Sequence, residues 1–268
     1  MTSDRPRRLV AEAIGTMLLL AAVVGSGIMA DRLSGGNQAI ALLANTIATG
    51  AALIALILTF GWVSGAHFNP AVSIADASQG GLSWADAGAY IVAQLLGAFL
   101  GVGLAHVMFG APLYSWSTHA RAGSAQIVSE GVATFGLLSV IWGCARTRPN
   151  AVAFAVGAYI TAAYWFTSST SFANPAVTLA RAATDTFAGI RPFDVPGFLF
   201  GQIAGTTAAT MLFKWLVPTL PEVAERIVVP HESAPLERAG RKQGGSQAVQ
   251  RAVLVHRKFS AASWPRRC

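Results

Sequence analysis

The sequence is poor in charged residues. Only 12% of its 268 residues are Asp, Glu, Lys or Arg, whereas 53% are hydrophobic and the mean hydropathy is +0.51. A soluble globular domain carries about 25% charged residues. The deficit argues against a cytosolic globular protein and favours a protein that lies within a lipid bilayer.

The chain also lacks basic residues interleaved with aromatic ones. Its formal net charge is +7, but nine of its nineteen Lys and Arg residues lie after Pro218 and three more precede residue 9. Proteins that bind nucleic acids combine basic grooves with aromatic side chains on which bases stack. The apolar body of this chain offers no such surface, so no nucleic-acid partner is predicted.

Cysteine is nearly absent as well. Cys144 and Cys268 are too few for a disulfide framework or a metal cluster, so the sequence predicts no bound metal and no cofactor. No loop gathers a nucleophile, a base and an acid, which argues against an enzyme. The apolar run after Arg8 is too long for a signal peptide and has no small-residue cleavage site before Asp31. We therefore interpret it as a first membrane span.

Six apolar stretches are long enough to cross a hydrocarbon core, which takes about 20 residues of helix. They are residues 9–30, 39–60, 86–109, 126–145, 150–167 and 196–217. Two shorter apolar pieces, 70–79 and 175–184, each follow an Asn-Pro pair. Ten helical residues rise only about 15 Å, half of a hydrocarbon core of about 30 Å. These two pieces are expected to be re-entrant half-helices that meet near the middle of the membrane.

The distribution of basic residues predicts the topology. Six spans put both chain ends on one side, and the N-terminal arginines, Arg146, Arg148 and the basic tail all lie there. By the positive-inside rule this side is cytoplasmic. The chain then divides into a cytoplasmic N-terminus (1–8), a channel-forming body (9–217) and a basic, disordered cytoplasmic tail (218–268). The tail is either solvated or bound to an anionic membrane surface.

The two halves of the body resemble each other. "AEAIGTMLLL" opens the first span and "SEGVATFGLL" the fourth, which aligns Glu12 with Glu130. "QLLGAFLG" and "QIAGTTAA" likewise align Gln94 with Gln202. Each half contains three spans, an odd number, so the second half inserts upside down. This inverted 3+3 repeat is typical of transport proteins whose site lies on broken helices at the membrane midplane. The predicted fold is therefore an all-α membrane protein with six transmembrane helices and two re-entrant half-helices.

The tetrapeptide Asn-Pro-Ala-Val occurs twice, 105 positions apart. Asn is a strong helix N-cap and Pro suits the first helical position. Each Asn oxygen is expected to cap its own half-helix, which leaves the amide nitrogen to donate to a passing solute. The two helix dipoles would disfavour cations at this point. The residues of the two motifs are Asn69, Pro70, Ala71, Asn174, Pro175 and Ala176.

These segments resemble the aquaporin and aquaglyceroporin superfamily. "AEAIGT", "SGAHFNPAVS", "AQLLGAFLG", "SEGVATFG" and "FANPAV" match its signature segments in order, over about residues 9–217. The resemblance implies one pore per subunit, a homotetramer, and passive conduction of water or small neutral solutes. It also implies that Glu12 and Glu130 brace the re-entrant loops by accepting backbone hydrogen bonds, and that the side chain of His67 anchors the first loop.

Members of this superfamily select solutes at a filter of four positions. Counted without gaps by the family's spacing, these are Thr49, Ala162, Ser171 and Val177. The fourth position usually holds arginine, accompanied by aromatic residues, and here it holds valine. The count therefore predicts a wide, weakly polar filter. Arg181 lies four residues beyond Val177, and either places a positive charge in the outer vestibule or serves only in packing.

A filter with valine in place of arginine resembles the aquaglyceroporins encoded in some bacterial arsenic-resistance operons, which conduct arsenite and methylated arsenicals outward. The sequence therefore predicts an inner-membrane channel for metalloid hydroxides, glycerol and water. Two alternatives stay open. One is a water channel with an unusual filter. The other is a coupled secondary transporter, for which Glu12 and Glu130 are the candidate ion-binding residues.

Overall fold

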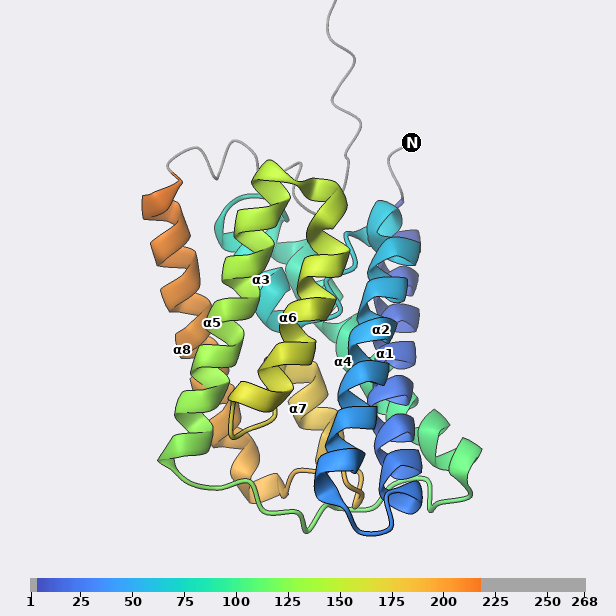
Figure 1. Ribbon diagram of the computed structural model, residues 1–268. Coiled ribbons are helices and arrows are strands. Elements are labelled where there is room, and N and C mark those ends of the chain that lie inside the picture. The colour runs from blue at the N-terminus through green and yellow to red at the C-terminus, as the bar shows by residue number, and fades with distance from the viewer. Residues whose placement is uncertain (1–3, 218–268) are drawn as a thin grey trace, which may run out of the picture. The chain divides into compact units, whose positions relative to one another are not determined.

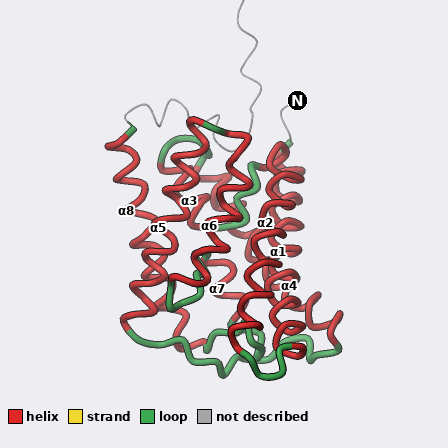
Figure 2. The backbone as a smooth tube through the Cα atoms, viewed as in Figure 1, coloured by secondary structure: helices red, strands yellow, loops and turns green. Residues whose placement is uncertain are grey.

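The computed structural model describes residues 4–217, without the side chains of Arg146 and Thr147, and the predicted tail at 218–268 lies outside the described residues. Within 4–217 the chain forms helices and loops and no strand (Figure 2). Its α-helices are α1 (Arg5–Leu33), α2 (Gln38–Ser64), α3 (Pro70–Ser78), α4 (Trp84–Phe109), α5 (Ser124–Thr147), α6 (Val152–Phe166), α7 (Pro175–Arg181) and α8 (Val195–Leu216). Short 3₁₀ turns, η1 (Pro149–Ala151) and η2 (Pro192–Asp194), precede α6 and α8.

The fold class predicted from the sequence is confirmed. Each of the six predicted spans corresponds to a long helix, with ends that differ by at most four residues, and each predicted half-helix corresponds to a short one. By length and composition, α1, α2, α4 and the Ser124–Ala145 part of α5 suffice to cross a membrane. Helix α6 has only 15 residues, fewer than the usual 20 or so. The inverted repeat assigns α6 and α8 as the remaining two spans.

The two halves run in opposite directions. Helix α1 begins at the end of the molecule marked N, whereas α5 begins at the other end (Figure 1). Helices α3 and α7 lie in the interior, with α3 towards the end marked N and α7 towards the opposite end (Figure 1). Below, these ends are called the N-terminal end and the opposite end.

Glycines allow close packing within each half. Helix α1 packs on α4, and α5 packs in the same way on α8. A Cβ atom at Gly97 of α4 would collide with the backbone carbonyl of Ala13 in α1, and one at Gly205 of α8 would collide with that of Gly131 in α5. Small residues let helix backbones approach in this manner in membrane proteins. Matching glycines therefore set the same contact in both halves.

The outer helix faces are apolar. Ile47, Leu96, Ile203 and Met211 are each more than half exposed on their helices. A soluble protein does not expose so many large apolar side chains along its long helices. The exposure fits contact with lipid, as expected of a multi-pass membrane protein.

Candidate functional site

The two re-entrant loops have an unusual backbone. Ala66 and Phe68 in the first loop have φ values of 50° and 49°, and Ser171 and Ala173 in the second have 50° and 48°. Residues other than glycine rarely adopt positive φ, and each costs about 1–3 kcal/mol unless its surroundings enforce it. The two pairs are 105 positions apart, the same interval that separates the Asn-Pro-Ala motifs. The strained conformation is therefore part of the repeat.

Glu12 accepts hydrogen bonds from the backbone of the first loop. Its Oε1 accepts hydrogen bonds from the His67 amide (2.9 Å) and the Ser64 hydroxyl (2.6 Å). Its Oε2 accepts from the Phe68 amide (2.7 Å) and from Gln94 Nε2 (2.8 Å). The carboxylate is fully buried, so these four donors replace its water shell.

Glu130 has the same arrangement in the second loop. Its two oxygens accept from the amides of Phe172 (2.8 Å) and Ala173 (2.9 Å), and Oε2 accepts from Gln202 Nε2 (2.6 Å). Gln202 also donates to Thr178 of α7 at 2.8 Å. Each glutamate thus connects a long helix to a loop and, through a glutamine, to a half-helix.

The Asn-Pro-Ala asparagines cap their half-helices and also bind the opposite loop. The side-chain oxygen of Asn69 accepts from the Ala71 amide (2.9 Å), and that of Asn174 accepts from the Ala176 amide (3.0 Å). The amide nitrogen of Asn69 donates to the Ala173 carbonyl, and that of Asn174 to the Phe68 carbonyl, both at 2.8 Å. A carboxamide nitrogen has two hydrogens. One hydrogen of each asparagine is therefore used between the loops, and the other is not engaged by these bonds.

The side chain of His67 is tied to the first half-helix. Its Nδ1 lies 3.0 Å from the Ser73 hydroxyl, and its ring packs edge-on against Tyr90. Its Nε2 lies 3.8 Å from Asp76 Oδ2. The ring is almost completely buried, so these contacts fix its orientation.

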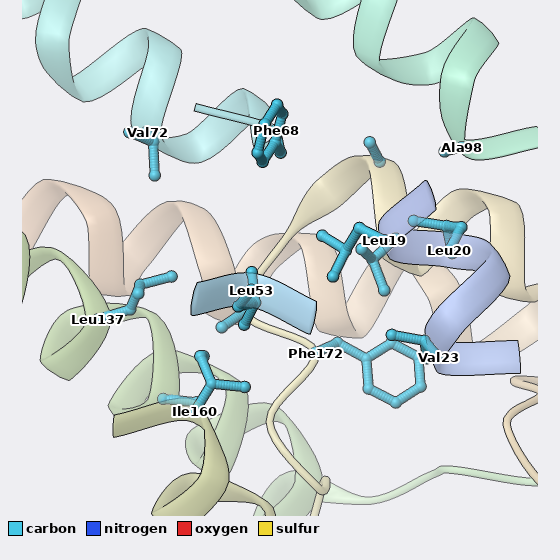
Figure 3. Packing of buried hydrophobic residues seen from close by; sticks show 14 of the residues in the cluster. Leu19, Leu20, Val23, Leu53, Phe68, Val72, Ala98, Leu137, Ile160 and Phe172 are labelled. Atoms are coloured by element: carbon cyan, nitrogen blue, oxygen red, sulfur yellow. The ribbon is translucent and has the colours of Figure 1, made fainter. Parts of the chain in front are cut away.

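A cavity of about 90 Å³ lies beside the two loops. Most of its wall is aliphatic, and Figure 3 shows Leu53, Leu137 and Ile160, from α2, α5 and α6, beside one another. The cavity is also lined by Gly65, Ala66, Phe68 and Ala173 of the loops and by three residues with polar side chains, His67, Asn69 and Asn174. The wall thus combines a few hydrogen-bonding groups with a larger apolar surface.

Three of the four predicted filter residues line this cavity, and one does not. Thr49, Ser171 and Val177 contribute to the wall, whereas Ala162 is exposed on α6 and does not. The cavity side of α6 is formed by Val152, Val156, Ile160 and Tyr164. These four residues are spaced four apart along the helix. Ala162 lies midway between Ile160 and Tyr164, two residues from each, which corresponds to a rotation of about 200° about the helix axis. The ungapped count therefore selected a residue on the wrong face of α6.

Two residues that the filter count left out lie on the wall instead. Tyr164 is buried, lines the cavity and donates from its hydroxyl to Thr49 Oγ1 at 3.3 Å. Arg181 is 2% exposed and also lines the cavity. The wall thus contains an aromatic ring and a guanidinium, neither of which is among the four residues predicted for the filter. The i, i+4 spacing from Ile160 to Tyr164 was the signal in the sequence that pointed to the tyrosine.

A helical membrane body with two half-helices, loops that line a cavity and a mostly apolar wall is typical of a membrane transport protein. The chain belongs to the major intrinsic protein family, whose model matches residues 1–151.

Several relatives cover most of the chain. It is 55% identical to the aquaglyceroporin AqpS of Rhizobium meliloti (strain 1021), over 83% of this chain and 95% of the relative. It is 32% identical to the probable aquaporin AqpM of Archaeoglobus fulgidus, over 81% and 99%. The X-ray structure of the aquaglyceroporin from Plasmodium falciparum superimposes with a TM-score of 0.64 at 21% identity and covers 81% of this chain and 99% of that one. The last similarity shows a shared fold.

Proposed function

We propose that the protein is a passive channel for small uncharged solutes, namely glycerol, water and metalloid hydroxides such as arsenous acid and methylated arsenicals. In the cell this channel would lie in the inner (plasma) membrane as a homotetramer with both termini in the cytoplasm, and would contribute to arsenic resistance by efflux. The similarity to the Rhizobium aquaglyceroporin over most of both chains supports a solute channel.

The choice of solute rests on the residue at position 177, which is a valine. It lines the cavity at the position where the family usually has arginine, and its short apolar side chain offers neither charge nor hydrogen-bond donors. Glycerol and arsenous acid are neutral molecules with three hydroxyl groups. Such a solute can exchange its water shell for the loop groups and the amides of Asn69 and Asn174 while its bulk passes along the aliphatic wall.

Reconstitution of the purified protein into liposomes tests this proposal. Stopped-flow light scattering would compare water, glycerol and arsenous acid for the wild type, Val177→Arg and Val177→Leu. The arginine adds bulk and charge to the wall, so glycerol and arsenous acid fluxes should fall by tenfold or more, since even single methylene differences give about 10-fold discrimination, while water flux falls less. The leucine variant controls for bulk alone. Unchanged solute flux in Val177→Arg would contradict the proposal.

The alternatives give different results in the same assay. A strict water channel would pass water and exclude glycerol and arsenous acid. A coupled transporter would need an ion-binding carboxylate beside the cavity, and its flux would depend on a proton or sodium gradient. Glu12 and Glu130 are already occupied by backbone amides and glutamine side chains, which favours the passive channel.

A further inference from the structure

Arg181 is a buried cation without a carboxylate partner. It is the last residue of α7, one helical turn beyond Val177. Its side chain lines the cavity and is 2% exposed. Burial of a charge is costly unless the charge is paired, yet among residues 4–217 no carboxylate lies within ion-pairing distance of its guanidinium. Retention of such a charge on the cavity wall calls for a functional explanation.

The protein holds this guanidinium in a fixed place. Its Nε donates to the carbonyl of Ala188, and its central carbon lies 3.4 Å from the centroid of the Phe172 ring. A cation over an aromatic face is stabilised by the ring quadrupole without being neutralised. Both contacts orient the side chain without neutralising it, and the buried carboxylate of Glu130 acts on its positive charge only from beyond ion-pairing distance.

A second buried arginine lies against the same ring. The guanidinium of Arg121, from the α4–α5 connection, lies 5.0 Å from the Phe172 centroid. It donates to the carbonyls of Gly189 (2.8 Å) and Ser169 (3.3 Å) and has no carboxylate partner among the residues described. It does not line the cavity. Burial lowers the pKa of Arg121 to about 10, so the group is still a cation at neutral pH.

His119 reports the positive potential at this end of the molecule. Burial, followed by the positive charges of Arg121 and Arg181, lowers the pKa of its imidazole. A nearby carboxylate, Asp185, opposes this effect but does not reverse it. At His119 the positive charges of Arg121 and Arg181 therefore outweigh the negative charge of Asp185.

We propose that Arg181 is the residue that excludes cations from this pore, in place of the filter arginine that the family has at the Val177 position. Compared with that arginine, the positive charge lies one helical turn further along α7. Contacts with the Phe172 ring and the Ala188 carbonyl keep the Arg181 side chain at the cavity wall. Arg121 is a positioning residue, because its guanidinium donates to the Ser169 carbonyl and to the Thr170 hydroxyl in the loop that leads to Phe172. The separation leaves room for a bulky neutral solute at Val177 and keeps a barrier to sodium and hydronium ions beyond it.

This inference rests on the proposed channel function and deepens it. At an effective dielectric constant of about 20, the Coulomb repulsion between two like charges a few ångströms apart is large enough to lower the occupancy of a cation beside Arg181 by about tenfold or more. Neutral solutes carry no charge for this barrier to act on. Cation leak and glycerol flux should therefore respond differently to loss of Arg181.

The test uses proteoliposomes of the full chain loaded with a pH-sensitive dye, with sodium leak measured in parallel. Arg181→Leu should raise the proton or sodium leak about tenfold or more over the wild type and leave glycerol flux equal or higher. Arg181→Lys keeps the charge and should leave both rates near those of the wild type. Arg32→Leu removes an exposed positive charge at the same end of the molecule, away from the cavity, and should leave the leak unchanged.

Two further variants keep the inference testable. Arg181→Gln removes the charge and retains a hydrogen-bond donor, so it should leak cations as Arg181→Leu does. If the leucine variant does not reconstitute, the glutamine variant tests the role of the charge in its place. The double variant Val177→Arg/Arg181→Leu returns the charge to the usual position and should restore a low leak. A leucine or glutamine variant that conducts glycerol but leaks no more than the wild type would overturn the role of Arg181. A wild type that conducts no glycerol would instead overturn the proposed function.

Discussion

Replacement of Glu130 by glutamine should destabilise the second re-entrant loop substantially. The carboxylate accepts two backbone amides and the Gln202 side chain at 2.6–2.9 Å, in a fully buried site. Hydrogen bonds to a charged group contribute about 1.5–3 kcal/mol each. Glutamine keeps one acceptor oxygen and places an NH₂ group against one of the former donors, so one bond is lost and the others weaken.

The expected loss is about 3–5 kcal/mol in the free energy of unfolding, from the lost bond and the buried donor that it leaves unpaired. The conformation of this loop is already strained, because Ser171 and Ala173 have positive φ values that cost about 1–3 kcal/mol each. Once Glu130 no longer holds the amides of Phe172 and Ala173, relaxation of this backbone should also reduce glycerol flux.

Denaturant titration of the purified protein in detergent, followed by circular dichroism, measures the change. The mirror variant Glu12→Gln should behave alike, since Glu12 accepts the amides of His67 and Phe68 in the same way. Asp31→Asn, at an exposed carboxylate near the end of α1, is the control and should stay within about 0.5 kcal/mol of the wild type. A Glu130→Gln protein as stable and as conductive as the wild type would refute the bracing role.

Two further predictions concern packing and pH. Gly97→Val should destabilise the protein by about 3 kcal/mol or more, because the new Cβ would collide with the Ala13 carbonyl. A Cβ at Gly88 has open space, so Gly88→Ala should be neutral or stabilising by up to about 1 kcal/mol. Equal unfolding midpoints for the two variants would contradict the close α1–α4 contact. Hydrogen bonds from the amide and then the hydroxyl of Thr118 lower the pKa of Asp185, so its contribution to stability is complete above the ordinary carboxyl pKa of about 3.9 and is lost as pH falls through the lower folded-state value. Asp185→Asn should therefore melt below the wild type at pH 7, and the difference should shrink as the pH falls below the ordinary carboxyl pKa. A difference that stays constant on acidification would exclude the assigned interaction.

Helix positions were predictable because their signals are local. Long apolar runs define the six long helices, and an Asn-Pro pair begins each short one, so the predicted half-helix starts at Pro70 and Pro175 agree with the structure. The alignment of Glu12 with Glu130 followed from the repeat alone. The structure shows both carboxylates making equivalent bonds to equivalent loops.

The cavity wall was less predictable. Residue spacing along the chain does not determine how a helix is rotated about its axis. For α6 the spacing predicted Ala162, whereas Ile160 and Tyr164 line the cavity. A single arginine near a helix end has several possible environments. Only the packed structure decides that Arg181 lies buried against Phe172 and faces the cavity.

The sequence by itself determined the membrane-embedded all-helical fold, the inverted repeat and the two capped half-helices, because hydrophobic length, residue pairs at helix starts and internal similarity are all encoded in neighbouring residues. Tertiary structure alone decided how the halves join at the centre, where Asn69 donates to Ala173 and Asn174 to Phe68 across more than 100 residues of chain. It also decided which side chains line the cavity, because contacts between distant segments set the rotation of each helix. A one-dimensional pattern does not contain that angle.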